Sequence, residues 1–168
     1  LKSFKDDFYR QICKARLGPV LDSIRYMKER NIWIEITTLV VPGLNDSKKE
    51  LADIASFIAQ TGADIPWHIS RFHPDYMSTG IKPTPVETLF MARSIGREAG
   101  LRYVYLGNVA QERDTLCCKC KKTLIKRSCL SAEVTGIGDN RCIYCNERPY
   151  WRKYRFRKAE RIFEEIRG

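Results

Sequence analysis

The sequence has no long apolar run and no apolar segment near its start. None of its uncharged stretches, such as residues 36–45, reaches the roughly 20 apolar residues that a membrane-spanning helix needs. Charged residues interrupt the segment from Leu1 to Asp7, which therefore lacks the apolar region of a secretory signal. We expect a protein without a membrane span that works in the cytoplasm. The chain also lacks an initiator Met, which suggests that Leu1 is not its natural start.

The cysteines do not suit a disulfide framework, because their number, seven, is odd and no secretory signal precedes them. Cys13 stands apart, and the other six fall within 29 residues: Cys117, Cys118, Cys120, Cys129, Cys142 and Cys145. Two pairs within this group have C-x-x-C spacing. Such paired spacing indicates four thiolates around one structural zinc ion, as in zinc ribbons.

The predicted zinc ligands are Cys117, Cys120, Cys142 and Cys145. Two alternatives stay open: Cys118 in place of Cys117 as a ligand, and a redox role for either C-x-x-C pair. Zinc ribbons usually have glycine after the second cysteine of each pair, where φ is positive. Lys121 and Asn146 occupy these positions here, and asparagine tolerates a positive φ better than lysine does.

The positive charge is concentrated in the last third of the chain. Residues 1–110 hold 15 Lys and Arg against 12 Asp and Glu, whereas residues 111–168 hold 15 against 8, within a net charge of +10. We predict a nearly neutral body over residues 1–110, a zinc ribbon over residues 111–148 and a basic, aromatic, helical tail over residues 149–168. Such a tail either binds nucleic acid by stacking and phosphate contacts or packs as a solvated helix on its own domain.

The body alternates strand-like and helix-like segments. Residues 32–41 are rich in β-branched residues on both faces, which predicts a strand in a sheet covered on both sides. Residues 67–72 and 102–106 predict two more strands. Capping boxes at Ser47–Glu50 and Thr84–Glu87 predict the helices between them. Short strand–helix–strand connections favour a parallel sheet, and its open edges indicate part of a larger α/β unit with a further strand truncated at the start.

Ligands of parallel α/β units bind where the strands end at their carboxyl side. His73 lies at such a strand end, directly before Pro74, and we predict a functional role for it. His68 lies in the middle of the same predicted strand. We interpret His68 as a buried histidine whose hydrogen bonds are satisfied inside the core.

Several motifs occur in an order that a known family shares. They are Leu1-Lys2-Ser3-Phe4, residues 40–46 (VVPGLND), residues 67–76 (WHISRFHPDY), residues 82–88 (KPTPVET) and residues 101–109 (LRYVYLGNV). Together with the C-x-x-C pairs, they resemble the radical S-adenosylmethionine (SAM) enzymes of the AmmeMemoRadiSam system, relatives of the pyruvate formate-lyase activating enzymes. The resemblance implies an α/β fold: the C-terminal half of a partial (β/α)6 radical SAM barrel, followed by a small zinc-ribbon domain.

The resemblance also implies residues that bind SAM. Lys2 matches a lysine that helps to hold SAM, and His73 matches a histidine near its adenine. Thr37 occupies the place of a SAM-contacting arginine, although a threonine cannot make a bidentate carboxylate contact. In the family, a [4Fe–4S] cluster and SAM generate a 5′-deoxyadenosyl radical. The cluster is bound by a C-x-x-x-C-x-x-C loop, and this spacing is absent from the sequence.

We therefore expect the chain to be inactive alone and to need an N-terminal radical SAM half, which is either encoded separately or lost by truncation, with a small molecule or a protein as substrate. One alternative is a zinc-ribbon module that binds nucleic acid or protein, and another is a degraded remnant that keeps only structural zinc. The basic tail favours the nucleic-acid module, which leaves residues 1–110 unexplained.

Overall fold

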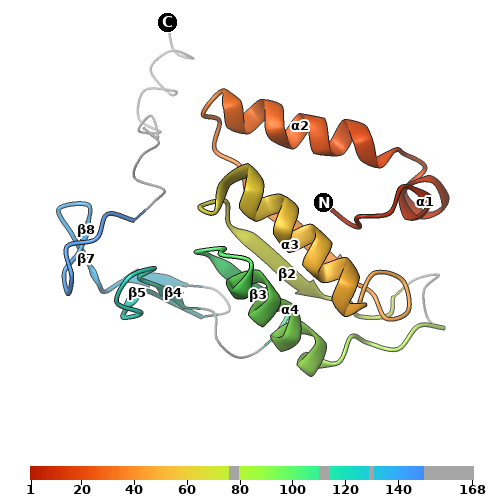
Figure 1. The fold of residues 1–168 in the computed structure, drawn as a ribbon. Coiled ribbons are helices and arrows are strands. Elements are labelled where there is room, and N and C mark those ends of the chain that lie inside the picture. Colours follow the sequence, from red (N-terminus) through yellow and green to blue (C-terminus); the bar gives the residue numbers. More distant parts are fainter. Residues whose placement is uncertain (76–79, 110–113, 129–130, 150–168) are drawn as a thin grey trace, which may run out of the picture.

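The computed structural model describes residues 1–75, 80–109, 114–128 and 131–149 (Figure 1). The first two ranges form helices and a parallel sheet. Their elements are α1 (Asp6–Phe8), η1 (Tyr9–Cys13, a π-helical segment), α2 (Leu17–Glu29), β1 (Ile36–Val40), α3 (Lys48–Gly62), β2 (Trp67–Arg71), α4 (Val86–Glu98) and β3 (Val104–Gly107). No helix within the described ranges has the length and apolar character to cross a membrane. The predicted helical tail lies, apart from Pro149, outside the described residues.

The three strands pair in parallel in the order β1–β2–β3. In register, Thr37 of β1 lies beside His68 of β2, which lies beside Tyr105 of β3. Helix α3 connects the first two strands and α4 connects the second and third, as the alternation in the sequence predicts. The carboxyl ends of all three strands therefore lie at the same end of the sheet.

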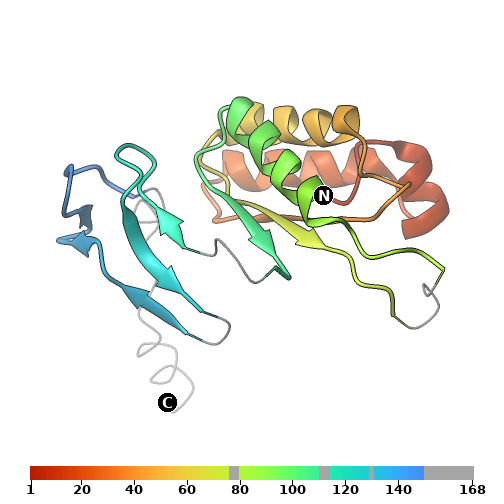
Figure 2. The ribbon, with the colours of Figure 1, turned by 90° about the horizontal axis from the view of Figure 1, so that it is seen from below.

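Helices cover one face of this sheet. Figure 2 shows α2, α3 and α4 on the same side of the strands. Along β1, Ile36, Thr38 and Val40 are buried, whereas Thr37 and Leu39 are exposed on the opposite side, which we call the open face. The expectation of two covered faces is thus wrong for the described residues. It failed because β-branched and apolar residues also occupy the exposed positions, so the strand lacks a polar alternation.

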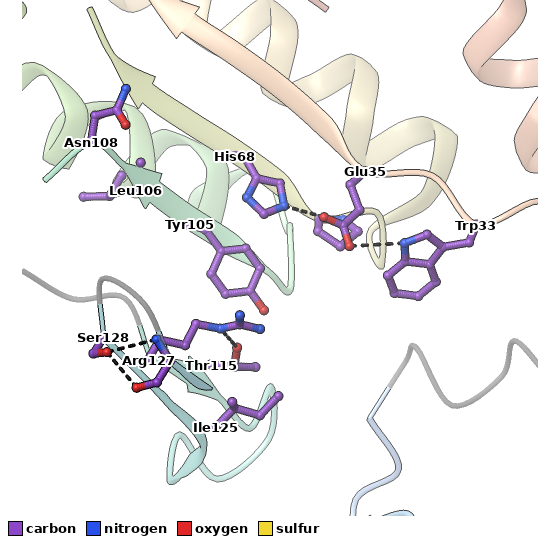
Figure 3. Close-up of a pocket in the computed structure, with 13 residues that line it drawn as sticks. Trp33, Glu35, His68, Tyr105, Leu106, Asn108, Thr115, Ile125, Arg127 and Ser128 are labelled. Atoms are coloured by element: carbon purple, nitrogen blue, oxygen red, sulfur yellow. Dashed lines mark hydrogen bonds and ion pairs between the residues drawn. The ribbon is translucent and has the colours of Figure 1, made fainter. Parts of the chain in front are cut away.

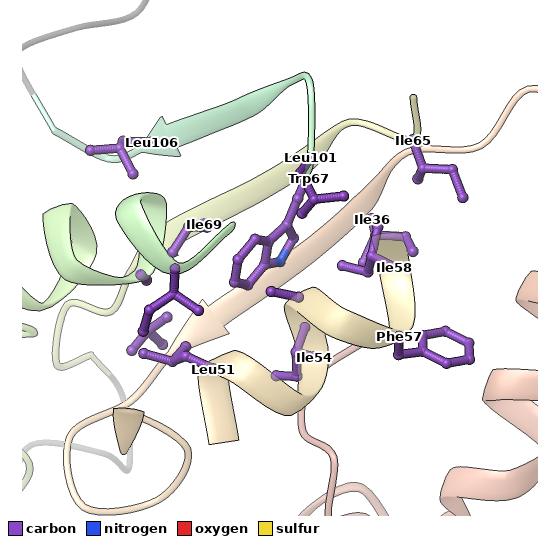
Figure 4. Packing of buried hydrophobic residues seen from close by; sticks show 14 of the residues in the cluster. Ile36, Leu51, Ile54, Phe57, Ile58, Ile65, Trp67, Ile69, Leu101 and Leu106 are labelled. Atoms are coloured by element: carbon purple, nitrogen blue, oxygen red, sulfur yellow. The ribbon is translucent and has the colours of Figure 1, made fainter. Parts of the chain in front are cut away.

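The covered face packs an apolar core between the sheet and the helices (Figure 4). Trp67 is fully buried in it, and its Nε1–H donates to Thr38 Oγ1 over 2.9 Å. Gly96 on α4 permits this packing, because a Cβ there would lie 3.0 Å from two carbons of the Trp67 ring. Other fully buried core residues include Leu51, Ile54, Ile58, Ile65 and Ile69.

The first residues of the chain lie along the free edge of β1. The Leu1 ammonium donates to Thr37 O over 3.3 Å, and Thr38 Oγ1 donates to Leu1 O over 2.8 Å. Asn45, in the loop after β1, donates its side-chain amide to Lys2 O over 2.7 Å. The segment therefore runs beside β1 in the same direction, in the place expected for a truncated strand.

Glu50 anchors this N-terminal segment from α3. Its buried carboxylate accepts hydrogen bonds from Ser3 Oγ and from Phe4 N (2.8 Å), and it pairs with Lys5 Nζ at 2.9 Å. Half of the predicted capping box forms, because Glu50 N donates to Ser47 Oγ over 3.3 Å. The Glu50 carboxylate serves the distant N-terminal segment instead of the start of its own helix.

Thr84 does not cap α4, so the second predicted capping box is wrong. Helix α4 begins at Val86 without a side-chain cap. The buried Thr84 hydroxyl donates to Val40 O over 2.6 Å and accepts from Phe72 N over 3.0 Å. It therefore ties the end of β1 to the end of β2, two groups that are remote from it in sequence.

The described residues after 113 form two small antiparallel sheets. One contains β4 (Thr115–Leu116), β5 (Thr123–Arg127) and β6 (Ala132–Val134), and the other contains β7 (Ile137–Gly138) and β8 (Arg141–Cys142). The core cluster of this region consists of Cys117, Leu124 and Cys142.

Candidate functional site

Four cysteine thiols converge in the second region. Cys117 and Cys120 lie between β4 and β5, Cys142 ends β8, and Cys145 follows it. Their Sγ atoms all lie within 4.8 Å of one another. The Sγ atoms of Cys117 and Cys145 are 3.6 Å apart, as are those of Cys120 and Cys142. Sulfurs bound at about 2.3 Å to one tetrahedral zinc ion lie roughly 3.8 Å apart, so the thiols are arranged for a single ion.

The two cysteine loops have the same backbone geometry. The residue after each second cysteine donates its N–H to the carbonyl of the first: Lys121 to Cys117 over 3.0 Å and Asn146 to Cys142 over 2.9 Å. The φ angles of Lys121 and Asn146 are 61° and 60°. This is the conformation that glycine usually provides at these positions of a zinc ribbon. The repeated turn brings both thiols of each pair to one centre.

Burial and backbone N–H groups act on the thiols in opposite directions. Burial raises the pKa of Cys142, but the N–H groups of Tyr144 and Cys145, with the thiols of Cys120 and Cys145, lower that pKa more, to about 7. Burial raises the pKa of Cys117 and outweighs its N–H contacts. The centre therefore forms one thiolate readily. A cation bound there would favour the ionised form of all four thiols.

The other described cysteines lie outside this centre. Cys118 is adjacent in sequence but is not among the four converging thiols, and Cys13 ends η1 in the helical region. The structure therefore brings Cys117, and not Cys118, to the other three thiols. Cys129 lies outside the described residues.

Two of the predicted SAM contacts lie at the carboxyl ends of strands. Lys2 lies beside the end of β1, where Asn45 holds its carbonyl, and His73 is exposed two residues beyond β2. Thr37 lies nearer the start of β1, on the open face. The parallel topology places Lys2 and His73 at the same end of the sheet. Contact of these residues with SAM stays a prediction.

His68 is not buried in the core, so its interpretation as a buried histidine is wrong. Its side chain keeps 34% exposure, and its Nε2 lies 2.7 Å from Glu35 Oε2. Its ring stacks on Tyr105, with the ring centres 5.1 Å apart. Sequence reasoning missed this group, because the proximity of Glu35 and Tyr105 to His68 depends on the register of three strands.

No family model matches the chain. The chain is 43% identical over 147 residues to the uncharacterized protein MJ0808 of Methanocaldococcus jannaschii, and the match covers 84% of this chain and 44% of that protein. It therefore spans less than half the length of this curated relative. The crystal structure of a domain of pyruvate-formate lyase-activating enzyme from Bacteroides vulgatus is similar, with a TM-score of 0.55, 18% identity and coverage of 64% of each chain. That similarity shows a shared α/β fold.

Proposed function

We propose that this chain is the C-terminal portion of a radical SAM enzyme of the AmmeMemoRadiSam type. Residues 1–110 form the second half of a partial (β/α)6 barrel in this proposal, and residues 111–148 form a zinc ribbon. The observation that carries it is the open face of the sheet, in a fold similar to that of a pyruvate-formate lyase-activating enzyme domain. A (β/α) barrel keeps helices outside its strands and its site at their carboxyl ends.

The edge of β1 supports a barrel that continues before Leu1. A groove of about 660 Å³ runs along Trp33 to Ile36 and the facing side of α2. Because the Leu1 ammonium bonds Thr37 O, a chain that enters at Leu1 would pass along this groove as a strand parallel to β1. The relative, of which the match covers 44%, is long enough to supply such strands. We propose that the residues forming these additional strands, in the same polypeptide or a separate one, carry the cluster loop.

The SAM site in this proposal lies at the carboxyl ends of the strands. Lys2 and His73 would hold SAM there, and Thr37 would line the open face below it. SAM with a [4Fe–4S] cluster supplies a 5′-deoxyadenosyl radical in radical SAM enzymes, which takes a hydrogen atom from the substrate, here a small molecule or a protein. The position of His73, exposed directly after a parallel strand, supports this assignment.

The four thiols fit a structural zinc ion better than the catalytic cluster. Zinc in structural sites takes four ligands in a closed tetrahedron, and Cys117 and Cys142 are 1% and 2% exposed. An iron–sulfur cube holds its ligating sulfurs farther apart than a single ion does, whereas these sulfurs lie within 4.8 Å. We therefore assign zinc to Cys117, Cys120, Cys142 and Cys145 and leave the cluster to the residues before Leu1.

The test is SAM binding and cleavage by protein expressed with the coding sequence upstream of Leu1 and purified without oxygen. Reduction should yield 5′-deoxyadenosine. The variant His73→Ala should bind SAM up to about tenfold more weakly, since one hydrogen bond contributes about 0.5–1.5 kcal/mol. The matched control is Arg102→Ala, which removes an exposed side chain before β3, at the opposite end of the sheet. Protein that holds an iron–sulfur cluster but neither binds nor cleaves SAM would contradict the proposal.

Nucleic-acid binding is a second candidate function, because residues 111–168 hold 15 basic against 8 acidic side chains. Affinity for a labelled single-stranded RNA would then fall steeply with rising salt and would depend on residues 149–168. If deletion of residues 149–168 leaves the RNA affinity unchanged, the basic tail does not bind the RNA.

A further inference from the structure

We propose that a cleft on the open face binds a planar aromatic molecule that carries a carboxylate or phosphate group. The cleft has a volume of about 850 Å³ and lies between the parallel sheet and the β4–β6 sheet (Figure 3). Its wall on the parallel sheet runs from Glu35, before β1, across His68 of β2 to Asn108, just beyond the end of β3. Lys2, Thr37 and His73 are not among its lining residues, so the inference does not rest on the proposed SAM contacts.

One wall of the cleft is a hydrogen-bonded row of side chains. Glu35 Oε1 accepts from Trp33 Nε1 over 3.1 Å, and Glu35 Oε2 pairs with His68 Nε2 at 2.7 Å. Because an ionised carboxylate can only accept, His68 Nε2 carries the proton, and a neutral His68 keeps Nδ1 as an acceptor. Both Glu35 oxygens thus have hydrogen-bond partners within the wall. The Trp33 and His68 rings lie on either side of this carboxylate.

Tyr105 connects this wall to the second sheet. Its ring stacks on His68 with the ring planes at 25°. Burial raises the pKa of Tyr105 by more than its hydrogen bond to Thr115 and the charge of Arg127 lower it, so the hydroxyl stays protonated. Figure 3 shows Tyr105 and Trp33 on either side of the Glu35–His68 pair. A planar ring would pack against these aromatic groups.

The opposite wall supplies positive charge. Arg127 Nε donates to Thr115 Oγ1 over 3.2 Å, and the guanidinium extends into the cleft (Figure 3). The neighbouring carboxylate, Asp114, accepts from the backbone N–H of Arg127 over 2.9 Å. The guanidinium thus presents its amino groups for a bidentate contact with a carboxylate or phosphate. Ser128 and Ser131 add hydroxyl groups to the same wall.

These features together define the chemistry of the ligand. Small-molecule sites commonly measure about 300–1,000 Å³ and combine aromatic walls with a few polar groups, which this cleft does. Its aromatic wall favours a planar ring. Arg127 bonds Thr115 through Nε, so its amino groups can bind an anionic group of the ligand.

The test is titration of the purified full chain with two probes, 2-naphthoate and uridine 5′-monophosphate, which separate an aromatic acid from a nucleotide. Calorimetry gives the affinity, and the NMR signal of the Trp33 indole N–H reports the position. We expect saturable binding of one probe that shifts this signal. Arg127→Gln should weaken it about tenfold through loss of a charge-assisted contact. The matched control, Lys126→Gln, alters the adjacent exposed residue of β5 and should leave the affinity unchanged.

Two further probes and variants keep the proposal open to refutation. Naphthalene-2-methanol, which lacks the charge, should bind the wild-type protein more weakly than 2-naphthoate does. It should bind the wild type and Arg127→Gln with equal affinity. Arg127→Lys, which keeps the charge without the planar fork, should have intermediate affinity and guards against a folding defect in the Gln variant. The proposal is overturned if neither probe binds saturably, or if binding is unchanged in both Arg127→Gln and Tyr105→Phe.

Discussion

The interiors of the two described regions are filled differently. The core of the helices and parallel sheet contains 18 buried apolar residues, whereas the core of the cysteine region contains Cys117, Leu124 and Cys142. Burying one large aliphatic side chain contributes about 1.5–3 kcal/mol, while ordering each residue costs about 1–2 kcal/mol of backbone entropy. Leu124 is the one buried aliphatic side chain in the core of the cysteine region, so apolar burial offsets much less of this entropy there than in the first region. The four-thiol centre offers additional stabilisation to the cysteine region.

Replacing Cys142 by Ser should have the largest effect. We expect residues 114–149 to lose their structure while residues 1–109 keep theirs, because structural zinc contributes about 10–16 kcal/mol to the folding of small zinc-dependent units. Amide hydrogen exchange followed by mass spectrometry measures both regions in one sample. The control is Cys118→Ser, beside the centre but outside the four thiols. Equal amide protection of residues 114–149 in the two variants would show that the four-thiol centre does not stabilise the cysteine region.

A cavity in the core of the helices and parallel sheet should produce the next largest effect. This effect should be confined to residues 1–109. Leu51→Ala removes a fully buried side chain, and such changes cost about 2–5 kcal/mol. Urea unfolding monitored through Trp67 should show this loss, with the bound metal unchanged. Leu39→Ala, at an exposed position of the open face, should change the stability by less than about 1 kcal/mol. A loss of metal in the Leu51 variant would mean that the two regions are not stabilised separately.

Glu50 provides a smaller effect that depends on pH. Burial raises the pKa of Glu50, but hydrogen bonds from Ser3, Lys5 and the Phe4 N–H together lower it by more than burial raises it. The pKa therefore lies below its usual 4.5. A lowered carboxyl pKa stabilises the fold above the usual value, and that stabilisation is lost as the pH falls through the folded-state pKa. Glu50→Gln should cost about 1–3 kcal/mol at pH 7. In urea titrations, the difference in free energy of unfolding between variant and wild type should narrow below pH 4.5. A difference that does not depend on pH would refute a role for the Glu50 charge.

The two cysteine loops provide the smallest effect. Lys121 holds a positive φ of 61°, a conformation that costs energy for a residue with a Cβ, and its Nζ makes an exposed hydrogen bond to Cys118 O over 2.8 Å. Lys121→Gly should therefore stabilise the cysteine region by up to about 1 kcal/mol, while Asn146→Gly should change it less. Thermal unfolding of the metal-loaded protein measures the difference. Destabilisation by both changes would show that the Lys121 and Asn146 side chains contribute contacts that outweigh the backbone conformation.

The cysteine centre was predictable from sequence because its ligands are set by short, local spacing. The contacts of Glu50 and Thr84 were not, since a capping pattern is local whereas their partners lie 47 and 44 residues away. The three strands and their parallel order followed from the alternation of segments. The open face of β1 did not, because Leu39 is apolar although exposed.

The predicted SAM contacts and the proposed aromatic cleft show the same limit. The position of His73 after a strand was readable from sequence, because a strand end is a local feature. The association of Glu35, His68 and Tyr105 requires the register of three strands and the placement of a second sheet against them. Sequence patterns therefore locate residues on elements, while tertiary structure decides which of them meet.

The metal content of protein purified without oxygen tests the central claim most directly, namely that four thiols holding one ion replace an apolar core in the cysteine region. Elemental analysis should find about one zinc per chain, and Cys120→Ser should lose it without lowering the urea midpoint of the parallel-sheet region. The absence of any metal would contradict the account. So would stoichiometric iron and sulfide that disappear in the same variant.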